Sequence, residues 1–282
     1  MLEFTYAGPD VRFTKAVSAQ YPSLSYSHIR RLLREKDVMI NGKRTKEDIE
    51  IKAGDVVRLY TDIRDSGNYV YKAEIVYQDD NIIIFNKPKG LETEGEISLS
   101  EHAKTVCPDA LPCHRLDVNT DGLIIFAKGE EIRDAVSKAI REGQIEKYYL
   151  CAVYGSFKKS EDTVTAYLVK DKAKSHVRIY DVQVPHSVRI KTSYKVLNYL
   201  NGFSVLEVRL HTGRTHQIRA HLAHLGHPVL GDGKYCPMDV NKKFPFSKQA
   251  LTAYRLVFNT SGILAYLKGK SFEINCKLKE LY

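Results

Sequence analysis

One stretch decides how the rest of this chain is interpreted, and it occupies residues 114–128: His114-Arg115-Leu116-Asp117-Val118-Asn119-Thr120-Asp121-Gly122-Leu123-Ile124-Ile125-Phe126-Ala127-Lys128. Its second part, residues 122–127, is apolar apart from one glycine, which is typical of a buried strand. Its first part is polar and comes directly before that strand, at an end of the predicted sheet where functional loops commonly lie. Arg115 and Asp117 are therefore the first candidates for chemistry.

The surrounding sequence alternates predicted strands with helices. Further strands are expected at residues 82–85, 148–153 and 203–210, and an amphipathic helix at residues 130–142 stops at Gly143. The order is not a regular series of strand–helix–strand units, and the chain contains neither G-x-G-x-x-G nor a P-loop. We therefore predict an α+β fold with a mixed sheet rather than a doubly wound one.

A second polar segment, residues 212–221 (T-G-R-T-H-Q-I-R-A-H), follows the strand at 203–210 and opens a helix. Thr215 is expected to cap that helix. Gly213 would let the backbone approach a ligand closely, and a helix N-terminus beside Arg214 suits a phosphate group. The segment is thus a candidate binding loop for an anion.

Asp117 permits more than one interpretation from residue types alone. Nearby arginines should keep its carboxyl group ionised at neutral pH, so that it could act as a nucleophile toward a sugar carbon or as a base. A paired-carboxylate glycosidase would also need a protonated acid, for which Asp121 and Asp232 are the obvious candidates. Equally, an Arg–Asp pair could simply brace a loop, and this alternative stays open at this point.

Histidines and cysteines do not indicate a metal site. Five histidines lie between residues 211 and 227, and two of them, His221 and His224, share a helix face, but no cysteine or carboxylate completes a known ligand spacing. The five cysteines are scattered and include no C-x-x-C pair. We expect no metal and reduced, unpaired thiols.

The first sixty residues form a separate pattern. Helices are expected at residues 10–21 and from residue 25 onward, followed by a strand at 38–40, an Asn-Gly turn and a strand at 56–60. Residues 63–72 lose this periodicity and are interpreted as a linker. Basic side chains gather on the second helix and the turn, where they could bind phosphates or simply form a solvated face.

Charge and apolar content limit the class of partner. Lys and Arg number 43 against 34 Asp and Glu, a net charge of +9, which favours an anionic partner such as nucleic acid or an anionic membrane surface. No run of eighteen apolar residues occurs, and the first residues lack the pattern of a signal peptide. We expect a cytoplasmic protein that does not associate with membranes.

Both polar segments closely resemble signatures of the RluA family of pseudouridine synthases. Residues 114–128 match H-R-L-D-x-x-T-S-G-L-x-x-F-A-K except at Asp121, and residues 213–232 match G-R-T-H-Q-I-R-x-H-L-x-x-x-G-H-P-x-x-G-D. Residues 86–90 match the family's N-K-P-x-G turn, and residues 147–152 match K-x-Y-x-A with the alanine one place late. The resemblance extends over about residues 75–280. It implies a largely antiparallel sheet and an isomerase that converts uridine to pseudouridine in RNA without cofactors.

The resemblance also implies roles for individual residues. Asp117 would be the catalytic aspartate, which either attacks the anomeric carbon of the ribose or removes a neighbouring ribose proton. Arg219 would pair with it, and Tyr149 would stack on the flipped-out base. The residues expected to contact RNA in this domain are Arg115, Arg214, His216 and Gln217.

The N-terminal pattern resembles the S-four RNA-binding domain, which often precedes this catalytic core. The resemblance divides the chain into residues 1–62 for RNA binding, 63–72 as a linker and 73–282 for catalysis. Thr14 replaces the acidic residue that the S-four domain usually has before Lys15, so one helix contact is open. The basic residues expected to contact RNA in this domain are Lys15, Arg30, Arg31, Lys43 and Arg44.

The resemblance leaves the substrate open. Large-subunit ribosomal RNA is the expected target of a monomeric enzyme, with transfer RNA as an alternative. A catalytically silent RNA-binding or ribosome-assembly factor and a glycosidase or nucleosidase are the competing classes. Asp121 and residues 92–94 (E-T-E) depart from the family pattern, and their negative charge could repel phosphate and narrow the choice of RNA.

Overall fold

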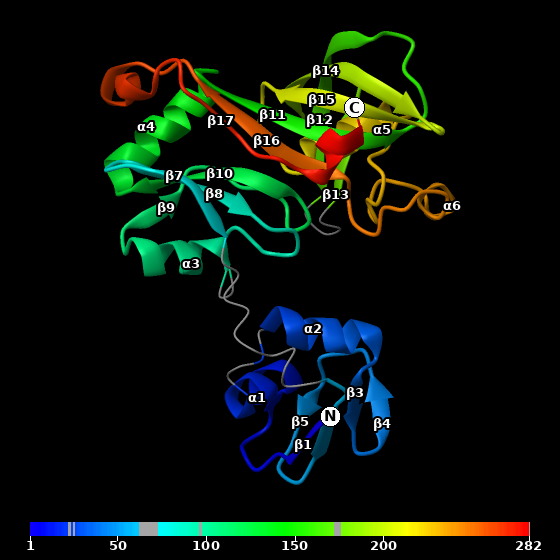
Figure 1. Cartoon of the computed structure of the whole chain (residues 1–282). Coiled ribbons are helices and arrows are strands. Elements are labelled where there is room, and N and C mark those ends of the chain that lie inside the picture. The colour runs from blue at the N-terminus through cyan, green and yellow to red at the C-terminus, as the bar shows by residue number, and fades with distance from the viewer. Residues whose placement is uncertain (22–23, 25, 62–72, 96–97, 172–175, 282) are drawn as a thin grey trace. The chain divides into compact units, whose positions relative to one another are not determined.

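The chain was analysed as a computed structural model that describes residues 1–21, 24, 26–61, 73–95, 98–171 and 176–281 (Figure 1). It divides into two compact units, Met1–Lys72 and Ala73–Tyr282. The linker expected at residues 63–72 lies outside the described residues. None of the helices in the described ranges combines the length and the apolar character that a bilayer-spanning helix needs.

The first unit is a small α/β domain. An antiparallel sheet has the order β1-β6-β3-β4, and β2 pairs with β5. Residues Asn41 and Gly42, with φ of 48° and 78°, join β3 to β4, which confirms the predicted Asn-Gly hairpin turn. The elements are β1 (Leu2–Thr5), β2 (Val11–Arg12), α1 (Phe13–Gln20), α2 (Tyr26–Glu35), β3 (Val38–Ile40), β4 (Lys43–Thr45), β5 (Glu50–Ile51) and β6 (Val56–Leu59).

Asp48 provides the acidic contact that the sequence around Thr14 lacks. Both the backbone N–H and the hydroxyl of Thr14 donate to the Asp48 carboxylate, each at 2.9 Å. Because a carboxylate at a helix N-terminus stabilises the helix, α1 is capped by a residue 34 positions along the chain. The departure at Thr14 therefore leaves this helix end satisfied.

In the described part of the second unit, one mixed sheet of 11 strands has the order β13-β12-β14-β15-β11-β16-β10-β8-β7, with β17 on β16 and β9 on β10. Only β10 and β16 pair in parallel among the described strands, which confirms the predicted mixed, largely antiparallel sheet. The strands are β7 (Glu74–Gln78), β8 (Ile82–Lys87), β9 (Ala110–Pro112), β10 (Asp121–Lys128), β11 (Ile145–Tyr154), β12 (Glu161–Asp171), β13 (His176–Tyr180), β14 (Val188–Leu200), β15 (Phe203–Leu210), β16 (Leu251–Phe258) and β17 (Ser271–Glu273).

Helices cover the sheet and close its core. The amphipathic helix predicted at residues 130–142 is α4, whose Ile132, Val136 and Ala139 are buried in the main core. Figure 1 shows α4 and α5 near different ends of the sheet. The helices are α3 (Leu99–Val106), α4 (Glu130–Arg141), α5 (Gln217–His224), α6 (Met238–Asn241), η2 (Gly262–Leu267) and η3 (Lys277–Leu281).

Two local features determine how the polar segments approach the sheet. A Cβ atom on Gly122 would lie 2.1 Å from the carbonyl oxygen of Ala253, so the close pairing of β10 with β16 requires glycine there. The prediction that Thr215 caps α5 is wrong. His216 occupies that position in the left-handed conformation, with φ 53°, and its side chain makes no capping hydrogen bond.

Candidate active site

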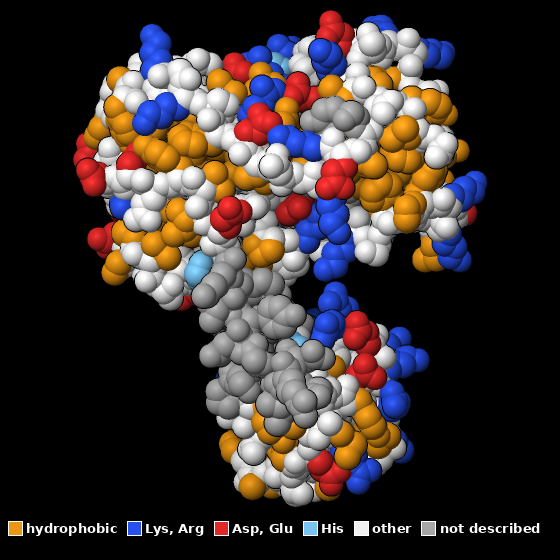
Figure 2. Space-filling view, viewed as in Figure 1, with side chains coloured by type: hydrophobic (Ala, Val, Ile, Leu, Met, Phe, Trp, Pro, Cys, Tyr) orange, Lys and Arg blue, Asp and Glu red, His pale blue; other side chains and the backbone are white. Residues whose placement is uncertain are grey.

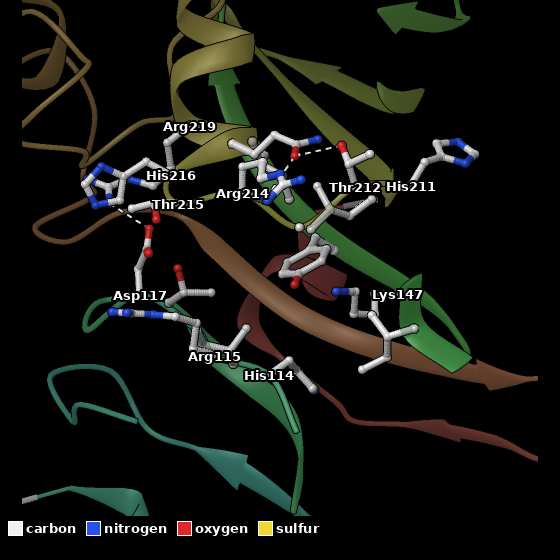
Figure 3. Close-up of a pocket in the computed structure, with 18 of the residues that line it drawn as sticks. His114, Arg115, Asp117, Lys147, His211, Thr212, Arg214, Thr215, His216 and Arg219 are labelled. Carbon is white, nitrogen blue, oxygen red and sulfur yellow. Dashed lines mark hydrogen bonds and ion pairs between the residues drawn. The ribbon is translucent and has the colours of Figure 1, made fainter. Parts of the chain in front are cut away.

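The two polar segments meet at one pocket of about 590 Å³ (Figure 3). Residues 113–117 and 120 line it from the loop before β10, and residues 210–219 line it from the end of β15 and the start of α5. Strand β11 contributes Lys147 and Tyr149. Segments that are about a hundred residues apart in the chain thus form a single site.

Asp117, Arg219 and Asp232 form a chain of charges beside this pocket. Arg219 binds the buried Asp232 through two nitrogens, with Nε 2.6 Å and Nη2 2.8 Å from the carboxylate oxygens. Its remaining nitrogen, Nη1, donates to Asp117 Oδ2 at 2.7 Å. Asp232 therefore fixes the guanidinium plane, and the guanidinium in turn orients Asp117.

Arg219 and Asp232 are both held in their charged forms. Burial alone would lower the pKa of Arg219, but its hydrogen bonds to Asp232 and Asp117 outweigh burial and raise that pKa. Burial would likewise raise the pKa of Asp232, but the bond from Arg219 outweighs it and holds the pKa below the usual value. Asp232 is therefore a permanent anion at neutral pH. It cannot supply the protonated acid that a paired-carboxylate glycosidase requires.

The loop that carries Asp117 is braced by residues that the sequence interpretation did not single out. The Thr93 hydroxyl donates to the carbonyl of Leu116 and accepts from its N–H, both at 3.2 Å. The ammonium of Lys87 donates to the carbonyl of Val118 at 3.2 Å. These contacts hold both neighbours of Asp117, which restricts the direction of its side chain. Lys87 lies in the N-K-P turn, and Thr93 lies in the segment that departs from the family pattern.

Tyr149 is buried in the pocket wall beside the carboxylate. Burial, and then the negative charge of Asp117, raise its pKa above the usual value, so the phenol is neutral at physiological pH. It presents an aromatic ring and a hydroxyl group to the pocket. Lys147, two residues earlier on β11, also lines the pocket and was not among the predicted site residues.

His216 is positioned by Tyr235. The His216 Nδ1 lies 2.8 Å from the hydroxyl oxygen of Tyr235, which also accepts from the N–H of Val177 at 3.1 Å. Burial lowers the pKa of His216 to about 4, so the ring is neutral at pH 7 and has no net charge with which to attract a phosphate. The ring of Tyr235 lies 5.2 Å from the guanidinium carbon of Arg219, so this tyrosine contacts both groups.

The residues predicted to contact RNA differ in exposure. Arg115 and Arg214 are exposed at the mouth of the pocket, where a backbone phosphate could reach them. Gln217 lines the pocket, but the residue is only 2% exposed and its amide oxygen is bonded inside the protein. It accepts from the Thr212 hydroxyl at 2.9 Å and from the Arg214 N–H at 3.1 Å, so it shapes the binding loop.

The acidic departures from the family pattern do not add charge to the pocket. Asp121 accepts from the Thr252 hydroxyl at 2.8 Å and lies 3.7 Å from Lys89. It lines a different cavity from the one that Thr120 lines. Glu92 and Glu94 are exposed and are not among the residues lining the pocket. Neither Asp121 nor these two glutamates therefore lines the candidate pocket, and their effect on the choice of RNA stays a prediction.

The histidine-rich segment does not form a metal centre in the part of the chain that the structure describes, where no three His, Cys, Asp or Glu side chains come together as ligands would. His221 Nδ1 lies 3.1 Å from the Thr192 hydroxyl, and His224 lies 2.8 Å from Asp181. These two histidines therefore have separate partners.

Comparisons with known proteins identify the family to which the chain belongs. A family model described as RNA pseudouridylate synthase matches residues 81–224. The ribosomal large subunit pseudouridine synthase C of Vibrio parahaemolyticus is 32% identical over 235 residues, covering 77% of this chain and 73% of that protein. The protein of the same name from Rickettsia bellii is 31% identical over 261 residues, covering 84% of this chain and 85% of that protein.

Solved structures show the same fold. The human RNA pseudouridylate synthase domain containing 1 protein superposes with a TM-score of 0.58 at 23% identity, covering 74% of this chain and 93% of that one. The sheet and the sequence matches together define an RNA-modifying isomerase. More specifically, the chain belongs to the RNA pseudouridylate synthase family, as the resemblance predicted.

Proposed function

We propose that this enzyme isomerises uridine through Asp117, and that the chain of charges from Asp232 through Arg219 to Asp117 prepares this carboxylate for reaction. The single observation that carries the proposal is the 2.7 Å bond from Arg219 to Asp117, made by the one guanidinium nitrogen that Asp232 does not bind. Among the described residues, the carboxylate is bonded by this one nitrogen through Oδ2, which leaves Oδ1 to reach the ribose of a flipped-out uridine.

Two routes are compatible with this placement. Asp117 either attacks the anomeric carbon or removes the adjacent ribose proton, and in both cases the bond from that carbon to N1 breaks with its electron pair passing to the uracil. The uracil then turns and its C5 bonds to the anomeric carbon. On the first route this step breaks the bond to Asp117, and on the second the ribose takes its proton back from Asp117. The proton lost from C5 is balanced by one gained at N1. Tyr149 provides the stacking surface for the base, and its neutral hydroxyl lies close enough to the carboxylate to respond to its charge.

Large-subunit ribosomal RNA is the proposed substrate. Bacterial relatives whose alignments cover 77% and 84% of this chain carry the name ribosomal large subunit pseudouridine synthase C. A cytoplasmic location would follow from such a substrate. Transfer RNA is the alternative substrate, and a silent assembly factor is the alternative class.

We further propose that the first unit binds RNA as an S-four domain. Lys15 and Lys43 are exposed, and no ion pair of either is found among the described residues. By contrast, Arg30, Arg31 and Arg44 lie 3.9, 3.9 and 3.5 Å from acidic groups, which reduces the positive charge they offer. Figure 2 shows Lys and Arg side chains along one edge of this unit, interspersed with acidic ones.

The test is to map pseudouridine by carbodiimide primer extension in ribosomal and transfer RNA from cells with and without the protein. We expect loss of one or more large-subunit sites, restored by the wild-type chain but not by Asp117→Asn, which keeps the size of the side chain. Restoration by Asp117→Asn would refute the catalytic role. Loss of pseudouridine from transfer RNA instead would favour transfer RNA as the substrate. If no site is lost, a catalytically silent assembly factor is favoured. Release of free uracil in vitro would indicate a nucleosidase.

A further inference from the structure

Lys147 is a buried cation for which the fold supplies no partner. Its side chain is only 7% exposed and lines the catalytic pocket from β11. Within the described ranges, its ammonium makes no hydrogen bond or ion pair with any side chain or carbonyl. Burial lowers the pKa of Lys147 to about 8, so most molecules still carry this charge at pH 7. A buried charge without a partner is costly and points to a ligand that completes it.

Lys87 shows what a buried lysine with a structural role looks like in the same unit. It is fully buried, and burial lowers its pKa to about 8 as well. Its ammonium, however, donates to three backbone carbonyls at 2.8–3.2 Å, those of Pro88, Leu91 and Val118. Lys87 therefore ties two loops together. Lys147, which is 7% exposed and lines the pocket, has no such contacts among the described residues, so a structural role of this kind does not explain it.

The surroundings of Lys147 leave its ammonium facing the pocket. The neighbouring His114 is neutral, because burial and the charge of Lys147 lower its pKa to about 3, and its Nε2 accepts from the N–H of Ile125. A Cβ atom on Gly213 would lie 3.4 Å from Lys147 Nζ, so the glycine keeps this side of the ammonium open. A nearby carboxylate would raise the pKa of Lys147, but burial is the sole cause of its shift. No carboxylate of the described residues therefore offsets the positive charge of this ammonium.

The pocket thus has opposite charges at its two ends. Figure 3 shows Asp117 beside Arg219 on one side and Lys147 on the other. Tyr149 lies between them in the structure, two residues from Lys147 on β11 and near enough to Asp117 for the carboxylate to raise its pKa. A uridine whose ribose meets Asp117 and whose base lies on Tyr149 would therefore direct the carbonyl edge of the base toward Lys147.

We propose that Lys147 is a catalytic residue that donates a hydrogen bond to a carbonyl oxygen of uracil and stabilises the negative charge of the detached base. This proposal rests on the proposed function of Asp117. When the bond from N1 to the ribose breaks, its electron pair stays on the uracil and is shared by N1, O2 and O4. Bond formation at C5 neutralises the base, and the proton then lost from C5 is balanced by one gained at N1, so Lys147 neither gains nor loses a proton.

The ammonium is suited to a base that turns within the pocket. Its three N–H donors rotate on a flexible stem and can follow an oxygen, whereas the planar guanidinium of arginine has a fixed donor geometry. In a pocket from which most water is excluded, such a positioned donor acts strongly on charge that develops during the reaction. Cytosine would present an amino group, itself a donor, in place of O4, so the same contact favours uracil.

The test compares full-length wild type, Lys147→Met, Lys147→Gln and Lys147→Arg on the RNA that the wild type modifies. We expect single-turnover rates to fall by ~10²–10³ for Met and Gln, the usual effect of removing one positioned donor. RNA affinity should change less than about threefold, as for one phosphate contact at most. Lys147→Arg should recover part of the single-turnover rate. Lys195→Met, which removes an exposed lysine of β14, serves as the control for loss of charge alone.

A second substrate separates charge stabilisation from a general defect. Fluorine at C5 withdraws electrons and stabilises the detached base, but it cannot leave C5 as a proton. On RNA with 5-fluorouridine at the target, the readout is therefore the single-turnover rate at which the base becomes linked to the ribose through C5, and the deficit of Lys147→Met in this rate should be at least about tenfold smaller than on uridine. Full activity of Lys147→Met, a deficit equal on both substrates, or a loss explained by weaker RNA binding would each overturn this proposal alone. No product from the wild type would overturn the proposed function, and this proposal with it.

Discussion

Replacing Lys147 by methionine should make the protein more stable, although it removes a residue from the active site. A pKa lowered from 10.5 to about 8 means that folding disfavours the charged ammonium by ~3 kcal/mol, at ~1.4 kcal/mol per pKa unit. Because the ammonium has no internal partner in the described residues, methionine loses no hydrogen bond there. We therefore expect the free energy of unfolding of Lys147→Met to exceed that of the wild type by ~2–3 kcal/mol at pH 7.

This difference should depend on pH in a defined window. Between pH 8 and 10.5 the unfolded wild type binds a proton at Lys147 that the folded state has already lost, so wild-type stability rises with pH there. Below pH 8 both states are protonated and the full deficit remains. The excess free energy of unfolding of Lys147→Met over the wild type should consequently shrink between pH 8 and 10.5 and be small above pH 10.5. The contributions of other titrating groups are the same in both proteins and cancel in this difference.

Urea denaturation followed by circular dichroism, from pH 6 to 10.5, measures this difference. The matched control is Lys87→Met, which leaves three backbone carbonyls without their donor. At ~1–3 kcal/mol for each buried group left unsatisfied, that variant should be less stable than the wild type. Both substitutions lie in the second unit and should move the same transition. A Lys147→Met variant that is destabilised at pH 7, as Lys87→Met is, would refute the reasoning.

Three further predictions follow from the contacts around the site. Asp232→Asn should lower the free energy of unfolding by ~3 kcal/mol, as when one partner of a buried ion pair is removed. It should also slow single-turnover modification at least tenfold, because the guanidinium plane of Arg219 is no longer fixed. A wild-type rate would contradict the role of this pair. Tyr235→Phe should lower the free energy of unfolding by ~1–3 kcal/mol, since the Val177 N–H and His216 Nδ1 lose their partner. An unchanged thermal unfolding temperature would contradict this structural role of the Tyr235 hydroxyl. The double substitution Lys15→Gln and Lys43→Gln should reduce the slope of log RNA affinity against log salt concentration by ~1.5, since each lost phosphate contact contributes ~0.7–0.9. An unchanged slope would show that these lysines form only a solvated face.

Much of the fold could be predicted because its elements carry strong local patterns. The buried strands at β8, β10 and β15, the amphipathic helix α4 and the Asn-Gly hairpin all lie where periodicity and turn residues predict them. The capping of α5 was wrong because the left-handed conformation of His216, one residue later, ends the preceding loop. In this conformation the His216 side chain contacts Tyr235, which lies 19 residues further along the chain and outside the segment from which the cap was predicted.

The candidate site likewise contains features that the sequence predicted and others that only the structure shows. Asp117, Tyr149 and Arg219 were nominated from motifs and do line one pocket, but their catalytic roles stay proposals. Gln217 lies in the same motif, yet it is buried and shapes the loop. Motif membership alone cannot separate these cases, because the direction of a side chain depends on what packs against it.

The sequence by itself determined the family and much of the strand and helix pattern, and it nominated Asp117 as the reactive carboxylate, because these are recorded in contiguous motifs. Only the tertiary structure decided how that carboxylate is supported. Arg219 reaches Asp117 across 102 positions of the chain, and Asp232 fixes it from another segment. Whether a buried charge is satisfied depends on every group around it in space. That is why Lys87 and Lys147 look alike in the sequence, although one ties loops together and the other faces the pocket without a partner among the described residues.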